Sequence, residues 1–271
     1  MQKKLLCIST VWPEANATAA GTRLLGVLEF FKSDGYQIYI AATSTDEKVR
    51  TAIQALDFTT ERILLNSSSF DHYVRNLSPE IVLFDRFISE EQFGWRVREL
   101  IPKALRILDT EDLHSLRSAR ENALKNRSDF NLSSWMNLEL SKRELASIFR
   151  SDLSLMVSTY EYEQLITNFT VPSFLLYLLP LTYEHIPKEV QEVQASFEER
   201  SGYVFIGNGF HKPNIDAIKW LYESIWPEIL KTLPQATIEI YGAYLPKQIL
   251  QLHHPKKGFY IKGQIPKVAN A

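Results

Sequence analysis

Short apolar runs alternate along this chain with segments in which apolar residues recur every three or four positions. The runs are rich in Ile, Val, Leu and Phe at consecutive positions, which is typical of parallel strands buried on both faces. The pattern predicts a first series of strands at Leu5–Ser9, Gln37–Ala42, Arg62–Leu65, Ile81–Phe84, Ala104–Leu108, Leu153–Val157 and Ser173–Leu178.

Segments with helical periodicity lie between these runs. After the first run, Leu24, Leu28 and Phe31 recur at helical spacing, and Gly35 follows as a stop signal. Further helices are predicted at 69–76, 90–101 and 135–149. Strands that alternate with helices indicate right-handed β-α-β units and an open α/β sheet.

A second, shorter series follows a polar and charged stretch, 186–201, which we interpret as a linker. Its strands are predicted at Tyr203–Ile206, Thr237–Tyr241 and Phe259–Ile261, with helices at 214–232 and 246–252. We therefore expect two Rossmann-like parallel-sheet domains, 1–185 and 202–271. The second is expected to be incomplete, because a doubly wound domain usually has five or six strands.

Length and charge agree with a two-domain globular protein. The chain has 271 residues, and domains average roughly 150 residues. Its 30 Lys and Arg against 32 Asp and Glu lack the basic excess that non-specific nucleic-acid binding needs. One cysteine, Cys7, forms neither an intramolecular disulfide nor a multi-thiolate metal site, which favours a reducing, cytoplasmic compartment.

No apolar stretch is long enough to cross a bilayer. The longest, 174–181, is far shorter than the roughly 20 residues a spanning helix needs, although peripheral membrane contact remains open. Lys3 and Lys4 precede an apolar run and so suggest a signal peptide. Because Ser9 and Thr10 interrupt that run, we interpret it as a buried first strand.

Ionisable residues follow the predicted strand 104–108. They are Asp109, Glu111, Asp112, His114 and Arg117. Ligands of open α/β sheets bind outside the carboxyl ends of strands, which favours a functional site here. Thr110 could instead cap a helix that begins near Glu111, where carboxylates would only complement the helix dipole.

Helical spacing would place Glu111, His114 and Arg117 on one helix face. The imidazole of His114 could then hydrogen-bond a hydroxyl or a departing group; the alternative is a solvated histidine. The acids at 109–112 also suggest a cation site, because hard cations take oxygen ligands. A strand-end acid followed by helix-capping acids needs no metal, so we expect none.

Two loops are candidate anion sites, because small residues let backbone amides at a helix N-terminus approach a ligand. One is 15–21, which ends at Gly21. It lacks the dinucleotide fingerprint G-x-G-x-x-G, which disfavours a nucleotide-dependent oxidoreductase or epimerase. The other is the loop of Gly207, Asn208 and Gly209, to which Lys212 adds a charge. The alternative for both is an ordinary turn.

Several segments together resemble a known family. They are Val11–Glu14 with Ala20–Gly26, Ile107–Arg117, Tyr203–Asn208 with His211–Asn214, and Thr237–Gly242. In this order they resemble a GT-B-type glycosyltransferase of the retaining family 4, or group 1, type. The resemblance covers nearly the whole chain.

The resemblance implies transfer of a sugar, without a cofactor, from a nucleotide-diphosphate sugar to a glycan, lipid-linked or small-molecule acceptor. It implies catalytic roles for His114, Asp112 and Glu111, substrate contacts for Gly21, Arg23 and Arg117, and donor contacts for Gly207, Asn208, Gly209 and Lys212. Retention of the anomeric configuration is implied by the resemblance alone.

The chain departs from that family in its C-terminal part. Complete members continue beyond the position of Ala271, with a Gly- and Lys-containing segment and a glutamate pair that hold the donor. We therefore expect a truncated donor domain, weak nucleotide-sugar binding and no measurable transferase activity. The alternative function is a catalytically inactive, transferase-like binding module.

Overall fold

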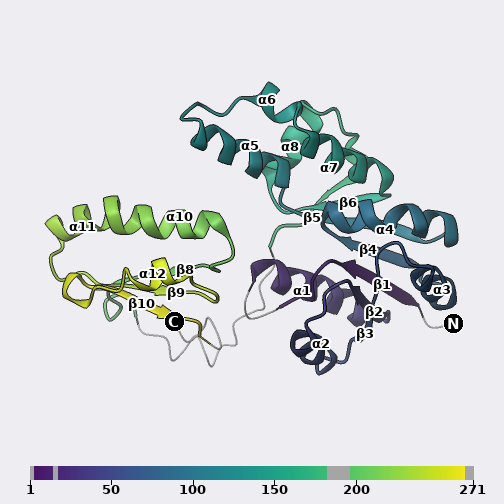
Figure 1. Ribbon diagram of the computed structural model, residues 1–271, viewed down its shortest axis with the longest axis horizontal. Helices are drawn as coiled ribbons and strands as arrows, with labels where there is room; N and C mark the ends of the chain where they lie inside the picture. The colour runs from purple at the N-terminus through teal and green to yellow at the C-terminus, as the bar shows by residue number, and fades with distance from the viewer. Residues whose placement is uncertain (1–2, 15–17, 182–195, 266–271) are drawn as a thin grey trace. The chain divides into compact units, whose positions relative to one another are not determined.

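The computed structural model describes residues 3–14, 18–181 and 196–265. It divides into two compact units, one of Met1–Glu14 and Ala20–Thr182 and the other of Ala15–Ala19 and Tyr183–Ala271 (Figure 1). The predicted linker, 186–201, lies mostly outside the described residues. The predicted domain boundaries therefore stay a prediction.

The first unit contains a parallel sheet of seven strands in the order β3-β2-β1-β4-β5-β6-β7. The strands are β1 Lys4–Ser9, β2 Gln37–Ala42, β3 Thr59–Arg62, β4 Ile81–Asp85, β5 Leu105–Glu111, β6 Leu153–Met156 and β7 Leu176–Leu178. In the centre, Cys7 of β1 pairs with Ile40 on one side and Leu83 on the other. The predicted parallel α/β sheet is confirmed.

One strand of this sheet was predicted at the wrong place. The apolar run 62–65 indicated a strand, but β3 lies at Thr59–Arg62. β3 is an edge strand in which only Thr60 is buried, so it carries no apolar run to mark it. Ile63, which is buried directly after the strand, produced the misleading pattern.

Helices cover both faces of the first sheet (Figure 1). They are α1 Ala19–Ser33, α2 Glu47–Gln54, α3 Ser68–Leu77, α4 Arg86–Leu100, α5 His114–Lys125, α6 Leu132–Met136, α7 Glu139–Arg150 and α8 Thr159–Thr167, with a short 3-10 turn, η1, at Ser173–Leu175. Leu5 and Cys7 pack into the core with α1 and α2. Leu6 and Ile8, which alternate with them, pack into the core with α3 to α8.

The second unit contains three parallel strands in the order β10-β9-β8, so it is a small second α/β domain. Its elements are β8 Tyr203–Ile206, α10 Lys212–Trp220, a π-helical turn η2 at Leu221–Ile225, α11 Trp226–Thr232, β9 Ile238–Tyr241, α12 Lys247–Leu250, a 3-10 turn η3 at Pro255–Lys257, and β10 Phe259–Gly263. The predicted helix 214–232 spans α10, η2 and α11.

One face of the second sheet forms the core of this unit. Ile240 and Phe259 pack there with Ile218, Trp226 and Ile249 from the helices. The side chains of β8 that point to the other face are exposed: Val204 at 55% and Ile206 at 47%. Within the described part of the chain, the second sheet therefore has one covered face where the first sheet has two.

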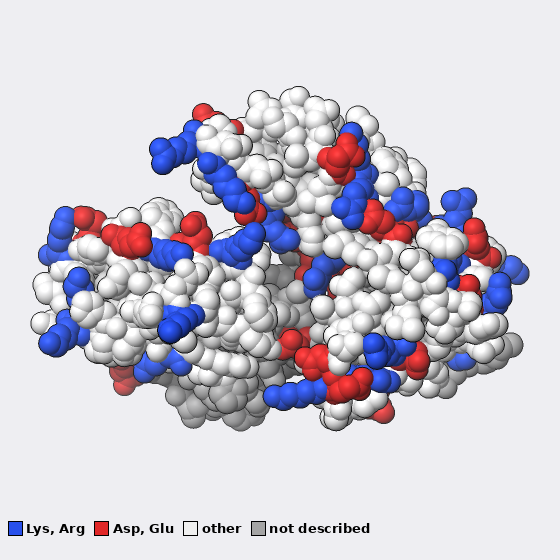
Figure 2. Space-filling view, viewed as in Figure 1, with Lys and Arg blue, Asp and Glu red and all other residues white. Residues whose placement is uncertain are grey.

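Lys and Arg are interspersed with Asp and Glu over both units on the face shown in Figure 2. No helix among the described residues is long and apolar enough to span a membrane.

Candidate functional site

Polar side chains meet where three neighbouring strands of the first sheet end. Ser9 ends β1, Asp85 ends β4 and Asp109 lies near the end of β5, and all three are buried. The Ser9 hydroxyl lies 2.6 Å from Asp85 Oδ2. The order of strands reverses between β1 and β4, and open α/β sheets bind ligands at such a switch point. We call the carboxyl ends of these strands, together with the residues that directly follow them, the carboxyl edge of the first sheet. This edge is the candidate site.

Arg23 and Asp109 form a buried ion pair beside this edge. Arg23 Nη2 lies 3.2 Å from Asp109 Oδ1, and the side chains are 3% and 1% exposed. Burial raises the pKa of Asp109, and the positive charge of Arg23 opposes that rise. Arg23 also donates to the carbonyl oxygens of Leu179 and Pro180. It ties α1 to β5 and to the chain after β7, and this enclosed position does not favour the predicted contact with substrate.

Two non-glycine residues at this edge have left-handed backbone, Arg86 with φ 67° and Glu111 with φ 61°. Such a conformation costs about 1–3 kcal/mol and clusters at functional sites. Arg86 Nε lies 3.3 Å from Asp85 Oδ1 and 3.9 Å from Glu111 Oε2. One guanidinium therefore lies between the carboxyl groups that end two adjacent strands.

The carboxyl group of Glu111 also lies in surroundings that disfavour its charged form. Burial raises the pKa of Glu111 to about 8; the negative charge of Asp85 adds to the rise, and Arg86 opposes it. Near pH 7 the carboxyl is therefore mostly protonated and can donate a hydrogen bond. Its Oε1 is buried and lacks a hydrogen-bond partner among the described residues.

His114 lies at the first position of α5, beside Asp112 and Arg117. Asp112 connects the other two: its Oδ2 lies 2.5 Å from Arg117 Nη1, and its Oδ1 lies 3.5 Å from His114 Nε2. The imidazole packs edge-on against the ring of Phe87, with centroids 5.5 Å apart. Burial lowers the pKa of His114, against the attraction of Asp112, so the ring is neutral near pH 7.

The expected helix face of Glu111, His114 and Arg117 is wrong. β5 continues through Glu111, with a bulge at Thr110 in its pairing with β6, and α5 begins only at His114. Thr110 is not a helix cap, because its hydroxyl donates to the carbonyl oxygen of Leu155. The apolar run ended at Leu108, so the sequence pattern placed the end of the strand too early.

Carboxylates from distant helices cap α5 instead. Glu144 of α7 accepts hydrogen bonds from the amides of His114, at 2.7 Å, and Ser115, at 2.9 Å. Glu161 of α8 accepts one from the amide of Leu113 at 3.2 Å. Burial raises the pKa of Glu144, and it raises the pKa of Glu161 to about 7.

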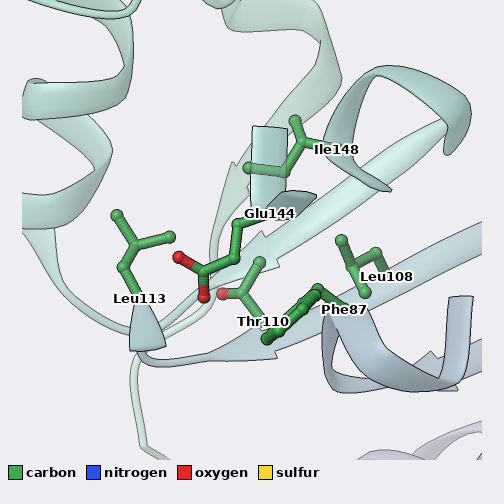
Figure 3. A pocket seen from close by; sticks show the side chains of 6 residues that line it. All are labelled: Phe87, Leu108, Thr110, Leu113, Glu144 and Ile148. Atoms are coloured by element: carbon green, nitrogen blue, oxygen red, sulfur yellow. The ribbon is translucent and has the colours of Figure 1, made fainter. Parts of the chain in front are cut away.

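The Glu144 carboxyl lies between Leu113 and Thr110, in a pocket that Phe87, Leu108 and Ile148 also line (Figure 3). These side chains leave no space for a water molecule between them. The pocket is therefore part of the packing that fixes α5 and His114, and it is no ligand cavity.

Gly21 lies in the first turn of α1, and residues 15–17 of its predicted anion loop lie outside the described residues. A Cβ on Gly21 would lie 2.5 Å from the backbone nitrogen and oxygen of Glu14. Close packing of α1 against the preceding chain therefore explains this glycine without a ligand. Its predicted contact with substrate stays a prediction.

The loop after β8 packs against the segment after β9. The amides of Gly207 and Gly209 donate to the carbonyl oxygens of Tyr241, at 2.9 Å, and Ala243, at 2.8 Å. A Cβ on Gly209 would lie 2.1 Å from the carbonyl oxygen of Tyr244. Both amides are thus occupied, one by the end of β9 and the other by the segment after it, which does not favour their predicted approach to a diphosphate. The donor contacts of this loop stay a prediction.

The other two predicted donor residues are Asn208, within this loop, and Lys212, which follows it. The Asn208 side-chain oxygen accepts a hydrogen bond from the amide of Phe210 at 2.7 Å. Lys212 is the first residue of α10. The loop is thus an ordered turn before a helix, and Lys212 and Asn208 remain candidates for donor contacts.

Ser9, Asp85 and Arg86 are site residues that sequence reasoning missed. Asp85 and Arg86 directly follow the predicted strand 81–84, so the rule that identified Asp109 would also have identified them. Ser9 is the last residue of the predicted strand Leu5–Ser9, so the same rule also applies to its hydroxyl. Among the described residues, no three His, Cys, Asp or Glu side chains are grouped to hold a metal ion.

The fold is similar to the GT-B fold that several glycosyltransferases and nucleotide-sugar epimerases share. No known family profile matches the sequence, and no curated sequence does either. A glycosyltransferase from Rickettsia africae ESF-5 is similar in structure, with a TM-score of 0.59 at 10% identity over 99% of this chain and 70% of that one. S. aureus TarM, whose structure contains UDP and alpha-GlcNAc-glycerol, has a TM-score of 0.64 at 8% identity, over 97% and 78%.

Epimerases have the same fold. UDP-GlcNAc 2-epimerase from Neisseria meningitidis, in complex with UDP-GlcNAc, has a TM-score of 0.56 at 15% identity, over 98% of this chain and 74% of that one. At these identities the comparisons establish the fold and leave the reaction open. They do not test the family 4 assignment that the sequence suggested.

Proposed function

We propose that this protein transfers a glycosyl group from a nucleotide-diphosphate sugar to an acceptor hydroxyl. The observation that carries the proposal is the contact of His114 with Asp112, whose Oδ1 lies 3.5 Å from His114 Nε2, directly after β5 at the carboxyl edge of the first sheet. Burial keeps the imidazole neutral, and Glu111, whose pKa burial raises, ends the same strand. The GT-B-like fold and the UDP-containing structures that share it support the same substrate class.

In this reaction the bond between the anomeric carbon and the diphosphate oxygen breaks, and the acceptor oxygen bonds to that carbon. The acceptor hydroxyl must also lose its proton. His114, kept neutral by burial, can accept a hydrogen bond from that hydroxyl, and Asp112 would stabilise the imidazolium if the proton moved. Arg117 holds Asp112 in place. Glu111 can donate a hydrogen bond to a sugar hydroxyl.

The second unit would hold the donor. Because the amides of Gly207 and Gly209 are occupied, the charge of the diphosphate would be met by a cation, and Lys212 at the start of α10 is the candidate. Asn208 lies on the same loop. The rate would come mainly from positioning donor and acceptor together.

Epimerisation of a nucleotide sugar is a second candidate function. Two observations favour it: an epimerase shares the fold, and the carboxyl groups of Asp85 and Glu111 flank Arg86 at adjacent strand ends. Inverting a carbon centre requires one proton to leave and one to return, and two such carboxyl groups could share these tasks.

Phosphorus NMR of the 271-residue chain with millimolar UDP-, GDP- and ADP-sugars and an acceptor alcohol would test both candidates. Free nucleoside diphosphate with a new glycoside indicates transfer, whereas an intact nucleotide linked to an inverted sugar indicates epimerisation. Any turnover by the wild-type chain should fall about 10²–10⁴-fold in His114→Ala, which loses the proton acceptor.

The matched control is His72→Ala, which removes an exposed histidine of α3 and should leave turnover unchanged. Circular dichroism would establish that both variants are folded. Wild-type turnover by His114→Ala, or no binding of any nucleotide sugar at millimolar concentration, would contradict the proposed function.

A further inference from the structure

Two aromatic side chains stack on each other at the carboxyl end of the second sheet. Phe210 follows β8 and Tyr244 follows β9, and their ring centroids lie 4.4 Å apart with planes 15° apart. The pair is nevertheless open to solvent, since Phe210 is 76% exposed and Tyr244 is 45% exposed. Two large ring surfaces are therefore presented at the end of the sheet where α/β proteins bind ligands.

The two loops that carry the rings are fastened to each other. The amide of Gly209 donates to the carbonyl oxygen of Ala243, one residue before each ring. On the other side of the contact, a Cβ on Gly209 would meet the carbonyl oxygen of Tyr244, so only glycine allows this approach. The side chain of Asn208 holds the amide of Phe210 at 2.7 Å.

The backbone of Tyr244 is left-handed, with φ 59°. A non-glycine residue adopts this conformation at a cost, which the surrounding hydrogen bonds must offset. The result is a ring pair whose orientation is set by main-chain contacts and not by burial of the rings. Such preorganisation lowers the entropy that a ligand must overcome on binding.

From this arrangement we infer that the Phe210–Tyr244 pair is a stacking platform for a ring of the substrate, either the flat nucleobase or the apolar C–H face of the pyranose of a nucleotide sugar. The inference rests on the proposed function for the identity of the ligand. Aromatic side chains stack on any nucleobase, whatever its identity, because every base has a flat π face and the contact needs no hydrogen bond. The platform lies two residues from Lys212, which would meet the phosphates of the same ligand.

Chemical-shift titration of the 271-residue chain with UDP-GlcNAc tests the platform at the weak affinities expected. Phe210→Ala should weaken binding about tenfold or more, the size of effect that loss of one stacked ring produces. Phe210→Tyr keeps a ring and should stay within about twofold of wild type. Phe174→Ala is the matched control, because Phe174 of the first unit is also 76% exposed.

Separate titrations with uridine and with the methyl glycoside of GlcNAc identify the ring, which is the one whose binding Phe210→Ala weakens. If the wild-type chain binds UDP-GlcNAc and Phe210→Ala binds it equally well, the platform is overturned and the proposed function stands. If the wild-type chain binds neither UDP-GlcNAc nor either component, the platform is overturned as a site for this ligand. If it binds none of the other nucleotide sugars at millimolar concentration either, the proposed function is overturned as well.

Discussion

The two sheets of this protein begin alike and then differ. In each, the first three strands lie in the order third, second, first, with the intervening helices on one face. In the first unit a fourth strand, β4, then pairs with the free side of β1, and a second layer of helices covers the other face. Among the described residues, no strand occupies the corresponding side of β8.

Because only the first sheet is covered on both faces in the described chain, the two sheets offer different surfaces to a ligand: buried polar strand ends in the first unit, and exposed loops in the second. The ends of β1 and β4 lie in a sheet that is covered on both faces, where Ser9 and Asp85 are buried and the pKa of nearby Glu111 is raised. The second sheet has no such buried strand ends facing a second layer in its described part. It offers loops with satisfied amides and an exposed ring pair. Groups that change protonation are therefore concentrated in the first unit.

The largest expected effect comes from the enclosed charges of the first unit. Arg23→Met leaves Asp109 buried without its partner, which should lower the stability of this unit by about 3–5 kcal/mol. Urea denaturation followed by residue-resolved NMR would measure each unit separately. The second unit should be unaffected.

Two variants sharpen this measurement. Arg143→Met breaks the solvent-exposed pair with Glu91 and should cost less than about 1 kcal/mol. Arg23→Met combined with Asp109→Leu should recover most of the loss, because neither charge then remains buried alone. Equal costs for Arg23→Met and Arg143→Met would show that enclosure of the pair has no energetic consequence.

Shortening an isoleucine side chain to alanine should cost more stability in β1, the first strand of the first sheet, than in β8, the first strand of the second sheet. Ile8 of β1 is fully buried, and Ile8→Ala should cost about 2–5 kcal/mol. Ile206 of β8 is 47% exposed at the sheet edge, so Ile206→Ala should cost less than about 1 kcal/mol. The same denaturation experiment compares them. A large loss from Ile206→Ala would mean that β8 is covered in solution.

The loops after β8 and β9 pack so closely that adding one methyl group at Gly209 should destabilise the second unit. Gly209→Ala would place its Cβ against the carbonyl oxygen of Tyr244, at a cost of about 1–3 kcal/mol confined to this unit. Gly26 of α1 has open space around it, and Gly26→Ala should stabilise the first unit by about 0.5–1 kcal/mol. Effects of equal sign would contradict the assignment of Gly209 to close packing.

Glu111 should make the stability of the first unit depend on pH between about 4.5 and 8. Because its folded pKa, about 8, is raised above the ordinary value, the wild-type protein loses stability as pH rises from about 4.5 through 8. Glu111→Gln removes the contribution of Glu111 to this loss. We expect the variant to be more stable than wild type by about 1–5 kcal/mol at pH 9, where the upper figure corresponds to the full rise of the Glu111 pKa from 4.5 to about 8. At pH 4.5 the difference should vanish, as pH-dependent thermal denaturation would show.

The order and type of most elements could be predicted from the sequence because apolar runs identify buried parallel strands well. The strand at 203–206 was placed correctly for this reason. β3 was misplaced, since a sheet-edge strand needs few apolar residues. The pairing order within each sheet depends on long-range contacts that no local pattern records.

The candidate site was predictable only in part. The rule of strand ends identified Asp109, Glu111 and His114 correctly as neighbours of one edge, but it could not reveal that Arg23 is buried against Asp109. The bulge at Thr110 also changed the geometry, because it extended β5 and moved the start of α5. Both features result from tertiary packing and leave no signal at their own positions.

The capping of α5 has a consequence for how this protein folds. Leu113, at the N-cap position, provides no side-chain cap, and the amides that follow are held by Glu144, 29 and 30 residues further along the chain. An isolated peptide of this helix should therefore be largely unstructured in water. The turn that carries His114 can become ordered only after α7 has docked, so loop closure over that distance precedes assembly of the site.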